Sequence, residues 1–311
     1  MKKKIFIDGR AGTTGLRIYE RLEEREDIEL IVLSDDERKD VAARKRALNE
    51  ADVAFLCLPD DAARESVSLI ENENTVVIDT STAHRTLEGW CYGFPELSAS
   101  FEQKLKGAKR IAVPGCHASG FIALVYPLIE KGIISPSAML TCHSITGYSG
   151  GGKKMIAEYE SDERSELFDA PRQYALGQTH KHLKEMKAIT CLENEPIFCP
   201  IVSDFYSGMC VTVPLFGSQL NEGYTAEDIK AVYAEKYNSE LVSYVENIDG
   251  SGLISGAALS RKDSMRLTVQ GNGDRILLIA VYDNLGKGAS GAAVECLNYV
   301  LGTEKTRGLD I

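Results

Sequence analysis

A cysteine at the start of an apolar segment is the feature of this chain with the clearest chemical potential. The stretch Ala112–Gly120 reads AVPGCHASG, and an apolar segment typical of a helix, Phe121–Ile129, follows directly. This order predicts that Cys116 lies at a helix N-terminus, where free backbone N–H groups and the helix dipole favour a thiolate. A thiolate is a nucleophile for acyl chemistry, and the same N–H groups can stabilise an oxyanion. The alternative is a buried structural cysteine.

A histidine pair farther along the chain could manage the protons that such a nucleophile needs. His180 and His182 lie two residues apart, and Glu185 follows His182 by three residues. On a helix that spacing lets the carboxylate orient the ring, and histidine is the natural acid–base near neutral pH. The alternative is a surface helix with solvated histidines. A His-x-His pair can also bind metal, but no further ligands cluster nearby in the sequence, so we expect no metal site.

The elements that must position these residues begin with a dinucleotide-binding pattern. A strand over Lys4–Asp8 runs into a turn with the spacing G-x-x-G-x-x-G, followed by a helix over Leu16–Arg25 and a strand over Glu29–Leu33. In such a βαβ unit the first glycine permits the tight turn, the second lets backbone approach a pyrophosphate, and the third lets the helix pack on the strand. The alternative is a glycine-rich turn that binds no ligand. The turn residues expected to contact the cofactor are Gly9, Gly12, Thr13, Thr14 and Gly15.

The end of the second strand bears on the choice of cofactor. NAD-dependent enzymes usually place an acidic residue there for the ribose 2′-hydroxyl, whereas NADP-dependent enzymes favour a basic or small polar site. Ser34 with Arg38 or Lys39 could hold a 2′-phosphate, and Asp35 could instead serve NAD. On balance these residues favour NADP.

The α/β alternation continues through strands over Asp52–Leu58, Thr75–Asp79 and Arg110–Val113. Ligands bind beyond the carboxyl ends of such strands, so Ser81 and Arg85 are expected on the cofactor and substrate side. The Arg85 guanidinium suits a phosphate or a carboxylate, and the alternative is a surface arginine.

From about residue 137 the pattern becomes that of an antiparallel α+β domain. A strand over Met139–Gly147 ends in a glycine-rich stretch with Ser149 and two lysines, which as a flexible loop could wrap an anionic group. A helix over Thr225–Tyr237 should pack on the sheet. The further expected strands cover Ile197–Val202, Cys210–Pro214, Leu241–Val245, Arg266–Gln270 and Arg275–Tyr282.

These elements predict an α/β chain with two domains, as its 311 residues also suggest. A Rossmann-type dinucleotide-binding domain should comprise residues 1–115 with 285–311, the last part containing a closing helix. Residues 116–284 should form an α+β catalytic and oligomerisation domain with a mostly antiparallel sheet.

Composition excludes several classes of partner. The net charge is −11 and no long basic block occurs, so nucleic acid and anionic membranes are not expected to bind. We see no signal peptide and no apolar run long enough to span a membrane. The eight cysteines lack zinc-type spacing, and in a chain of this length in which we see no signal peptide we expect them to be reduced thiols in the cytoplasm.

Taken together, the motifs resemble the N-acetyl-gamma-glutamyl-phosphate reductases of the semialdehyde dehydrogenase family, in their shorter bacterial form. The matching pieces span nearly the whole chain, and their order and spacing are specific. They are Gly9–Gly15, Asp79-Thr80-Ser81 with Arg85, Pro114-Gly115-Cys116, Gly147-Tyr148-Ser149-Gly150, His180-Lys181-His182 with Glu185, and Asp283-Asn284-Leu285 with Lys287-Gly288-Ala289.

The resemblance implies an NADPH-dependent step of arginine biosynthesis, in which an acyl phosphate is reduced to a semialdehyde through a cysteine thioester. Cys116 would be the nucleophile, and either His180 or His182 the acid–base, with His180 slightly favoured. Asn284 would approach the nicotinamide, and the phosphate would lie near Arg85 or the Ser149 loop. The resemblance also implies a homo-oligomer, either a dimer or a tetramer. Many relatives have proline where this chain has Lys184.

Two other functions fit parts of the pattern. An aspartate-semialdehyde dehydrogenase has the same architecture and thioester chemistry, but its substrate has a free α-amine that needs an acidic partner. A non-catalytic regulator that senses NADP would explain the Gly9 turn, but it gives no reason for a cysteine at a helix start with a histidine pair downstream.

Overall fold

The computed structural model describes residues 2–311, which divide into two compact units. Unit 1 comprises the chain up to Pro95, Ala99–Gly115 and Ala289–Leu309. Unit 2 comprises Glu96–Ser98, Cys116–Gly288 and Asp310–Ile311. Three segments that the sequence placed with the first domain, residues 96–98, 285–288 and 310–311, therefore cluster with unit 2. No helix within residues 2–311 is both long and apolar enough to cross a membrane.

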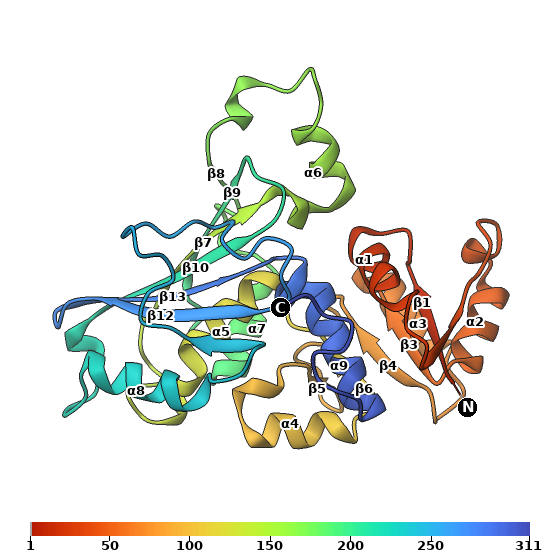
Figure 1. The fold of residues 1–311 in the computed structure, drawn as a ribbon, viewed down its shortest axis with the longest axis horizontal. Coiled ribbons are helices and arrows are strands. Elements are labelled where there is room, and N and C mark those ends of the chain that lie inside the picture. The colour runs from red at the N-terminus through yellow and green to blue at the C-terminus, as the bar shows by residue number, and fades with distance from the viewer. Residues whose placement is uncertain (1) are drawn as a thin grey trace. The chain divides into compact units, whose positions relative to one another are not determined.

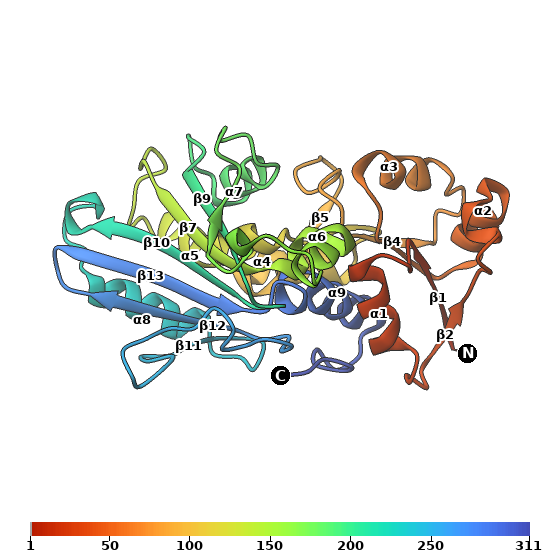
Figure 2. The same cartoon turned by 90° about the horizontal axis from the view of Figure 1, so that it is seen from above.

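Unit 1 is built on a parallel sheet of six strands in the order β2-β1-β3-β4-β6-β5 (Figure 1). The strands are β1 (Lys3–Asp8), β2 (Ile28–Ile31), β3 (Val53–Leu56), β4 (Val76–Asp79), β5 (Cys91–Tyr92) and β6 (Arg110–Ala112). The helices are α1 (Thr13–Leu22), α2 (Val41–Glu50), α3 (Asp60–Ser68), α4 (Ala99–Lys106) and α9 (Gly291–Leu301). Figure 2 shows α1 and α3 on opposite sides of these strands. This is the Rossmann-type arrangement that the sequence predicted.

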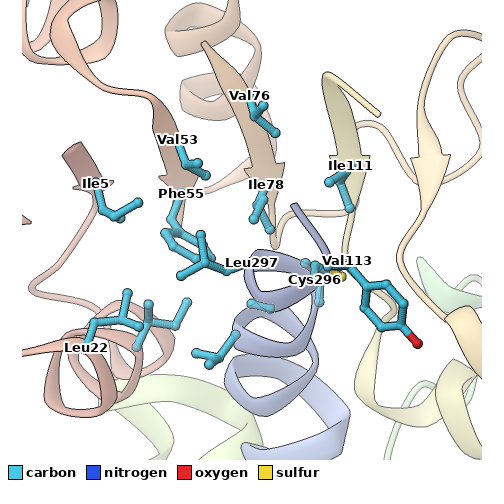
Figure 3. Packing of buried hydrophobic residues seen from close by; sticks show 14 of the residues in the cluster. Ile5, Leu22, Val53, Phe55, Val76, Ile78, Ile111, Val113, Cys296 and Leu297 are labelled. Carbon is cyan, nitrogen blue, oxygen red and sulfur yellow. The ribbon is translucent and has the colours of Figure 1, made fainter. Parts of the chain in front are cut away.

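Both faces of this sheet are buried, as expected for parallel strands. Along β3, Val53 and Phe55 pack toward α1 and α9, whereas Ala54 and Leu56 pack toward α2 and α3. Figure 3 shows Phe55 with Leu297 of α9 on the first face. Burial of Val53, Phe55 and Leu56 contributes about 1.5–3 kcal/mol for each side chain. These contacts anchor β3 between the two layers of helices.

Unit 2 is built on a mixed sheet of seven strands in the order β11-β12-β13-β10-β7-β9-β8. All neighbours are antiparallel except the pairs β11–β12 and β7–β9, so the predicted mostly antiparallel sheet is confirmed. The strands are β7 (Thr141–Gly147), β8 (Arg172–Gln173), β9 (Ile197–Ser203), β10 (Met209–Phe216), β11 (Val242–Tyr244), β12 (Met265–Gly271) and β13 (Arg275–Tyr282).

One face of this sheet is covered by helices. The helix α5 (Cys116–Glu130) packs on β10 and β13, and it also contacts α7 (His182–Thr190) and α8 (Ala226–Lys236). Strands with one covered face alternate buried and exposed residues. Ser144 of β7 accordingly faces the helices, and its neighbour Ile145 is exposed on the other face.

The glycine-rich stretch after β7 differs from its prediction as a flexible loop. It forms a 3₁₀ turn over Tyr148–Gly151, and the helix α6 (Gly152–Tyr159) continues from it. The N–H groups of Tyr148 and Ser149 donate to the carbonyls of Phe205 and Tyr206, at 2.9 and 3.0 Å. Those long-range bonds order a backbone that glycine content alone would leave free.

Candidate active site

Cys116 is the first residue of α5, which confirms the predicted helix N-terminus. Its side chain is half-buried. Strand β13 reinforces the first helical turn, because the Tyr282 hydroxyl accepts the Gly120 N–H at 3.0 Å and donates to the Cys116 carbonyl at 2.5 Å. The backbone around the thiol is therefore held in place, with the positive end of the helix dipole beside the sulfur.

The histidine pair lies where α7 begins. His182 is the first residue of α7 and is buried, whereas His180 precedes the helix and is half-buried. The two ring centroids are 4.6 Å apart, and the His182 N–H donates to Nδ1 of His180 at 3.2 Å. That bond makes Nδ1 of His180 an acceptor, so the neutral ring carries its proton on Nε2. Glu185 lies buried in the next part of α7.

A third histidine, which the sequence reasoning missed, joins this pair. His117 follows Cys116 on α5 and is 3 % exposed. Its ring centroid lies 5.7 Å from those of both His180 and His182. Nδ1 of His117 is 2.7 Å from the Ser144 hydroxyl, and Nε2 is 2.7 Å from the Tyr174 hydroxyl. Its position directly after Cys116 could have marked His117 as a candidate site residue. Nothing in the sequence spacing, however, indicates that His117 contacts residues 144 and 174.

The electrostatics of this cluster are set by burial. Burial lowers the pKa of His117 to about 3, and the neighbouring His180 adds to the effect. Burial raises the pKa of the Tyr174 hydroxyl well above its usual value, and the charge of Cys116 raises it further. His117 is thus a neutral imidazole near pH 7, and Tyr174 keeps its hydroxyl proton at that pH. Although three rings meet here, no group of side chains within residues 2–311 has the arrangement of a metal site.

Ser149 and Asn284 are brought together in unit 2. Both are buried, and the Asn284 amide nitrogen donates to the Ser149 hydroxyl at 3.0 Å. The Asn284 oxygen accepts the Gly208 N–H at 2.8 Å. Asn284 therefore fixes the Ser149 turn in addition to any contact with a ligand.

The three glycines of the turn in unit 1 differ in how much space surrounds them. Gly9 has φ +86°, and a Cβ there would lie 2.3 Å from the Cys57 carbonyl oxygen. A Cβ at Gly15 would lie 2.5 Å from the Gly9 oxygen. A Cβ at Gly12 would meet nothing closer than 3.4 Å. Gly9 and Gly15 are thus required by the fold itself, whereas Gly12 leaves room above the start of α1, which follows at Thr13 and Thr14.

A pocket of about 280 Å³ adjoins this turn at the carboxyl ends of β1 and β2. Its lining includes Gly9, Arg10, Arg38, Lys39 and Arg44. Four of these side chains are basic, which suits a phosphate-bearing ligand. Arg44 is held by the buried Asp8 carboxylate at 3.0 Å.

The residues around Ser34 form a small polar network. Arg38 pairs with the exposed Asp35 at 3.3 Å. The Ser34 hydroxyl donates to Glu37 at 2.8 Å. Both Ser34 and Arg38 are exposed.

Ser81 and Arg85 lie at the carboxyl end of β4, as their place in the sequence predicted. The Asp79 carboxylate accepts bonds from the Ser81 N–H at 2.9 Å and from its hydroxyl at 2.7 Å. Arg85 is buried and donates to the carbonyls of Val113, at 2.8 Å, and Thr80, at 2.9 Å. The guanidinium therefore links the ends of β4 and β6, and its predicted binding of an anion stays a prediction.

Both units match models of known protein families. Residues 4–105 match the model described as "Semialdehyde dehydrogenase, NAD binding domain", and residues 116–284 match "Semialdehyde dehydrogenase, dimerisation domain". Unit 1 is thus an NAD(P)-binding domain, and unit 2 carries the dimerisation domain.

Similar proteins of nearly equal length are known from several bacteria. The chain is 48% identical to an N-acetyl-gamma-glutamyl-phosphate reductase of a Chelativorans species, over 97% of this chain and 99% of the relative. It is 43% identical to N-acetyl-gamma-glutamyl-phosphate reductase 2 of a Nostoc species, over 99% of both chains.

Solved structures share the fold at much lower identity. Aspartate semialdehyde dehydrogenase II of Vibrio cholerae, complexed with ASA, is 16% identical, with a TM-score of 0.73 over 97% of this chain and 99% of that one. Aspartate semialdehyde dehydrogenase of Candida albicans with NADP is 17% identical, with a TM-score of 0.67 over 97% and 99% of the two chains. At this identity the likeness shows the fold alone.

Proposed function

Because this chain belongs to the N-acetyl-gamma-glutamyl-phosphate reductases of the semialdehyde dehydrogenase family, we propose that it reduces N-acetyl-gamma-glutamyl phosphate to N-acetyl-L-glutamate 5-semialdehyde and phosphate, a step of arginine biosynthesis. The observation that carries the proposal is Cys116 at the start of α5, with three histidine rings and a tyrosine beside it. No such cluster is needed by a protein that only senses a nucleotide.

The reaction begins with Cys116. Its thiolate attacks the acyl phosphate carbonyl, and the N–H groups at the start of α5 stabilise the oxyanion. The tetrahedral intermediate expels phosphate and leaves an acyl thioester on Cys116. Arg85 and the Ser149 turn are the candidates for holding the phosphate group, on the chemistry of a guanidinium and of a turn hydroxyl.

A histidine stabilises the oxyanion of the second half-reaction. NADPH, when bound, would supply the hydride that reduces the thioester. As the candidate acid, the half-buried His180 carries its proton on Nε2, because its Nδ1 accepts the His182 N–H, and it can share that proton as a hydrogen bond with the oxyanion that the hydride generates. The oxyanion collapses to the aldehyde as the C–S bond breaks, and Cys116 is restored as thiolate. His182 is the second candidate for this role, and Glu185 on the same helix would orient it.

Unit 1 has the residues that a dinucleotide needs. Gly12, Thr13 and Thr14 start α1, where backbone N–H groups favour a pyrophosphate. Arg38 and Lys39 line the basic pocket at the end of β2, which supports NADP over NAD. Ser34, Ser81 and Asn284 remain candidate cofactor contacts.

We also propose that two copies pair through the open face of the unit 2 sheet. The exposed apolar side chains on this face are Ile145 of β7, Ile197 of β9, Phe216 of β10 and Leu277 of β13. These exposed side chains lie within residues 116–284, which match a dimerisation domain. Light scattering should give at least a dimer mass, and Ile145→Asp should shift the mass toward the monomer. A monomeric native protein would reject this pairing.

The reverse reaction tests the proposed function. Purified protein is mixed with N-acetylglutamate semialdehyde, phosphate and NADP, and absorbance of the reduced cofactor is followed. Phosphate-dependent formation of NADPH is expected. A signal with aspartate semialdehyde instead would favour the aspartate-semialdehyde dehydrogenase alternative, and NADP binding with neither aldehyde active would favour a non-catalytic sensor.

A further inference from the structure

His117 is a buried polar side chain next to the nucleophile that the proposed mechanism does not use. It lies on the first turn of α5 and is 3 % exposed, with both ring nitrogens 2.7 Å from hydroxyl oxygens. Buried polar side chains are normally hydrogen-bonded, so two paired nitrogens alone also fit a purely structural role. What goes further is the identity of the partners: directly beside the nucleophile, the ring joins the Ser144 hydroxyl to the Tyr174 hydroxyl and can therefore set the direction of both their protons.

The protonation of the ring determines the direction of these two bonds. As a neutral imidazole, His117 has one N–H donor and one acceptor nitrogen. It either donates to Ser144 and accepts from Tyr174, or accepts from Ser144 and donates to Tyr174. In the second arrangement the Tyr174 hydroxyl keeps its proton and can donate it in a hydrogen bond to another acceptor.

Ser144 decides between the two arrangements. Its side chain is fully buried, on the face of β7 that meets the helices. Within residues 2–311, Nδ1 of His117 is the one hydrogen-bond partner of its hydroxyl. If Ser144 only accepted, its own buried proton would lack an acceptor, which is costly. The favoured arrangement therefore has Ser144 donating to Nδ1 and Nε2–H of His117 donating to Tyr174.

Cys116 and His117 are consecutive residues on the first turn of α5, and the Tyr174 hydroxyl lies 2.7 Å from Nε2 of His117. In keeping with this placement, the charge of Cys116 adds to the burial that raises the pKa of Tyr174. We propose that Ser144 and His117 form a positioning relay, which turns the Tyr174 hydroxyl proton toward the Cys116 sulfur so that Tyr174 stabilises the thiolate. The relay rests on the proposed function for the role of Cys116 in turnover. The other titratable groups that face this site are His180, His182 and Tyr282.

Substitutions at His117 separate the relay from simple packing. His117→Leu fills the space but removes both bonds. His117→Gln places an amide N–H near the position of Nε2 and should restore the donor to Tyr174. His143→Asn is the matched control, since His143 precedes Ser144 on β7 but is exposed on the opposite face.

The first readout is the alkylation rate of Cys116 by iodoacetamide at pH 7, followed by mass spectrometry of its peptide. Loss of one hydrogen bond to a thiolate should slow alkylation about 10-fold or more in His117→Leu and in Tyr174→Phe. His117→Gln should stay within about threefold of the native rate, as should His143→Asn. An unchanged rate in folded His117→Leu, or a rate in His117→Gln as low as in His117→Leu, would overturn the relay.

A double variant provides the second readout. If His117 acts through Tyr174, the variant with both His117→Leu and Tyr174→Phe should be no slower than Tyr174→Phe alone, whereas independent effects would multiply. Multiplied effects would overturn the proposal. Circular dichroism and thermal unfolding show whether each variant folds, and Tyr174→Phe provides the test if His117→Leu does not.

The alkylation assay also keeps the two proposals apart. It needs no substrate or cofactor, so it reports on the relay even if the native protein reduces NADP with neither aldehyde. If the reductase activity is present, kcat should fall with the alkylation rate across the variants while KM for the aldehyde changes little.

Discussion

The glycine turn of unit 1 and the histidine cluster of unit 2 are built in different ways. The turn is seven consecutive residues, Gly9–Gly15, which pack against one another and against the Cys57 carbonyl. The cluster joins α5, β7, the segment before α7, and β13, including a bond between residues 166 positions apart. The residues of the first site come from one short segment, whereas those of the second come from several distant ones.

This difference shows how closely each site is tied to folding. In the turn, two glycines serve the fold and one leaves room for a ligand, so the two requirements can be separated by substitution. In the cluster, the buried bonds of His117 both complete the packing and orient polar groups. A change there should affect chemistry and stability together.

The strongest test of the comparison removes the nucleophile alone. Cys116→Ala should reduce turnover by at least about 10⁴-fold, because no thioester can form. Binding of NADPH, measured by calorimetry, should remain, since Cys116 is not among its proposed contacts. Unchanged turnover would reject Cys116 as the nucleophile.

The burial of His117 should make the protein less stable in acid. The free ring titrates near pH 6.5 and the folded ring at about 3, so below pH 6.5 the unfolded chain binds a proton that the folded chain does not. The free energy of unfolding should therefore decrease on acidification, by up to about 1.4 kcal/mol per pH unit from this group. Urea unfolding of the native protein and of His117→Leu from pH 7 to 4 should give a smaller slope in the variant, and equal slopes would contradict the assignment.

The two histidines of the pair should differ in their effects. His180→Asn should lower kcat by about 10²–10³-fold if His180 is the acid–base, with KM changing less. His182→Asn then serves as its control and should cost less. Steady-state kinetics of the two variants show which histidine is the acid–base. A larger decrease in kcat in His182→Asn would assign that role to His182.

Alanine substitutions at Gly9 and Gly12 should distinguish the glycine that the fold requires from the glycine that ligand binding requires. Gly9→Ala forces a Cβ at positive φ into the Cys57 carbonyl and should destabilise the protein by roughly 2–4 kcal/mol in urea unfolding. Gly12→Ala has room and should keep native stability. It should nevertheless weaken NADP binding about 10-fold, because a methyl group enters the space proposed for the pyrophosphate. Native NADP affinity in Gly12→Ala would argue against that placement.

The smallest expected effect concerns the choice of cofactor. Arg38→Ala should reduce the preference for NADP over NAD by about 10-fold, since one cationic contact to the 2′-phosphate would be lost. The kcat/KM values with the two cofactors measure this preference, and Asp35→Ala should change it in the opposite direction, because it frees Arg38 from its ion pair and removes the residue that could serve NAD. If Arg38→Ala lowers both values equally, the 2′-phosphate lies elsewhere.

The sequence by itself determined the pattern of elements. The predicted strands lie within a few residues of their observed bounds, although the two-residue strands β5 and β8 were not predicted, and Cys116 begins a helix as expected. These features are local, since apolar periodicity and Pro-Gly turns depend on neighbouring residues. The G-x-x-G-x-x-G turn is local for the same reason, and its strained positions fall on glycines.

Only the tertiary structure decided which side chains meet. The glycine-rich stretch after β7 is ordered by the carbonyls of Phe205 and Tyr206, more than 50 residues along the chain, and was wrongly predicted to be a flexible loop. His117 gained its place through Ser144 and Tyr174, which belong to other elements. Arg85 proved to link two strand ends through their carbonyls. Such pairings depend on how strands and helices stack, because the free energy of burying a polar group is set by partners that sequence spacing does not reveal.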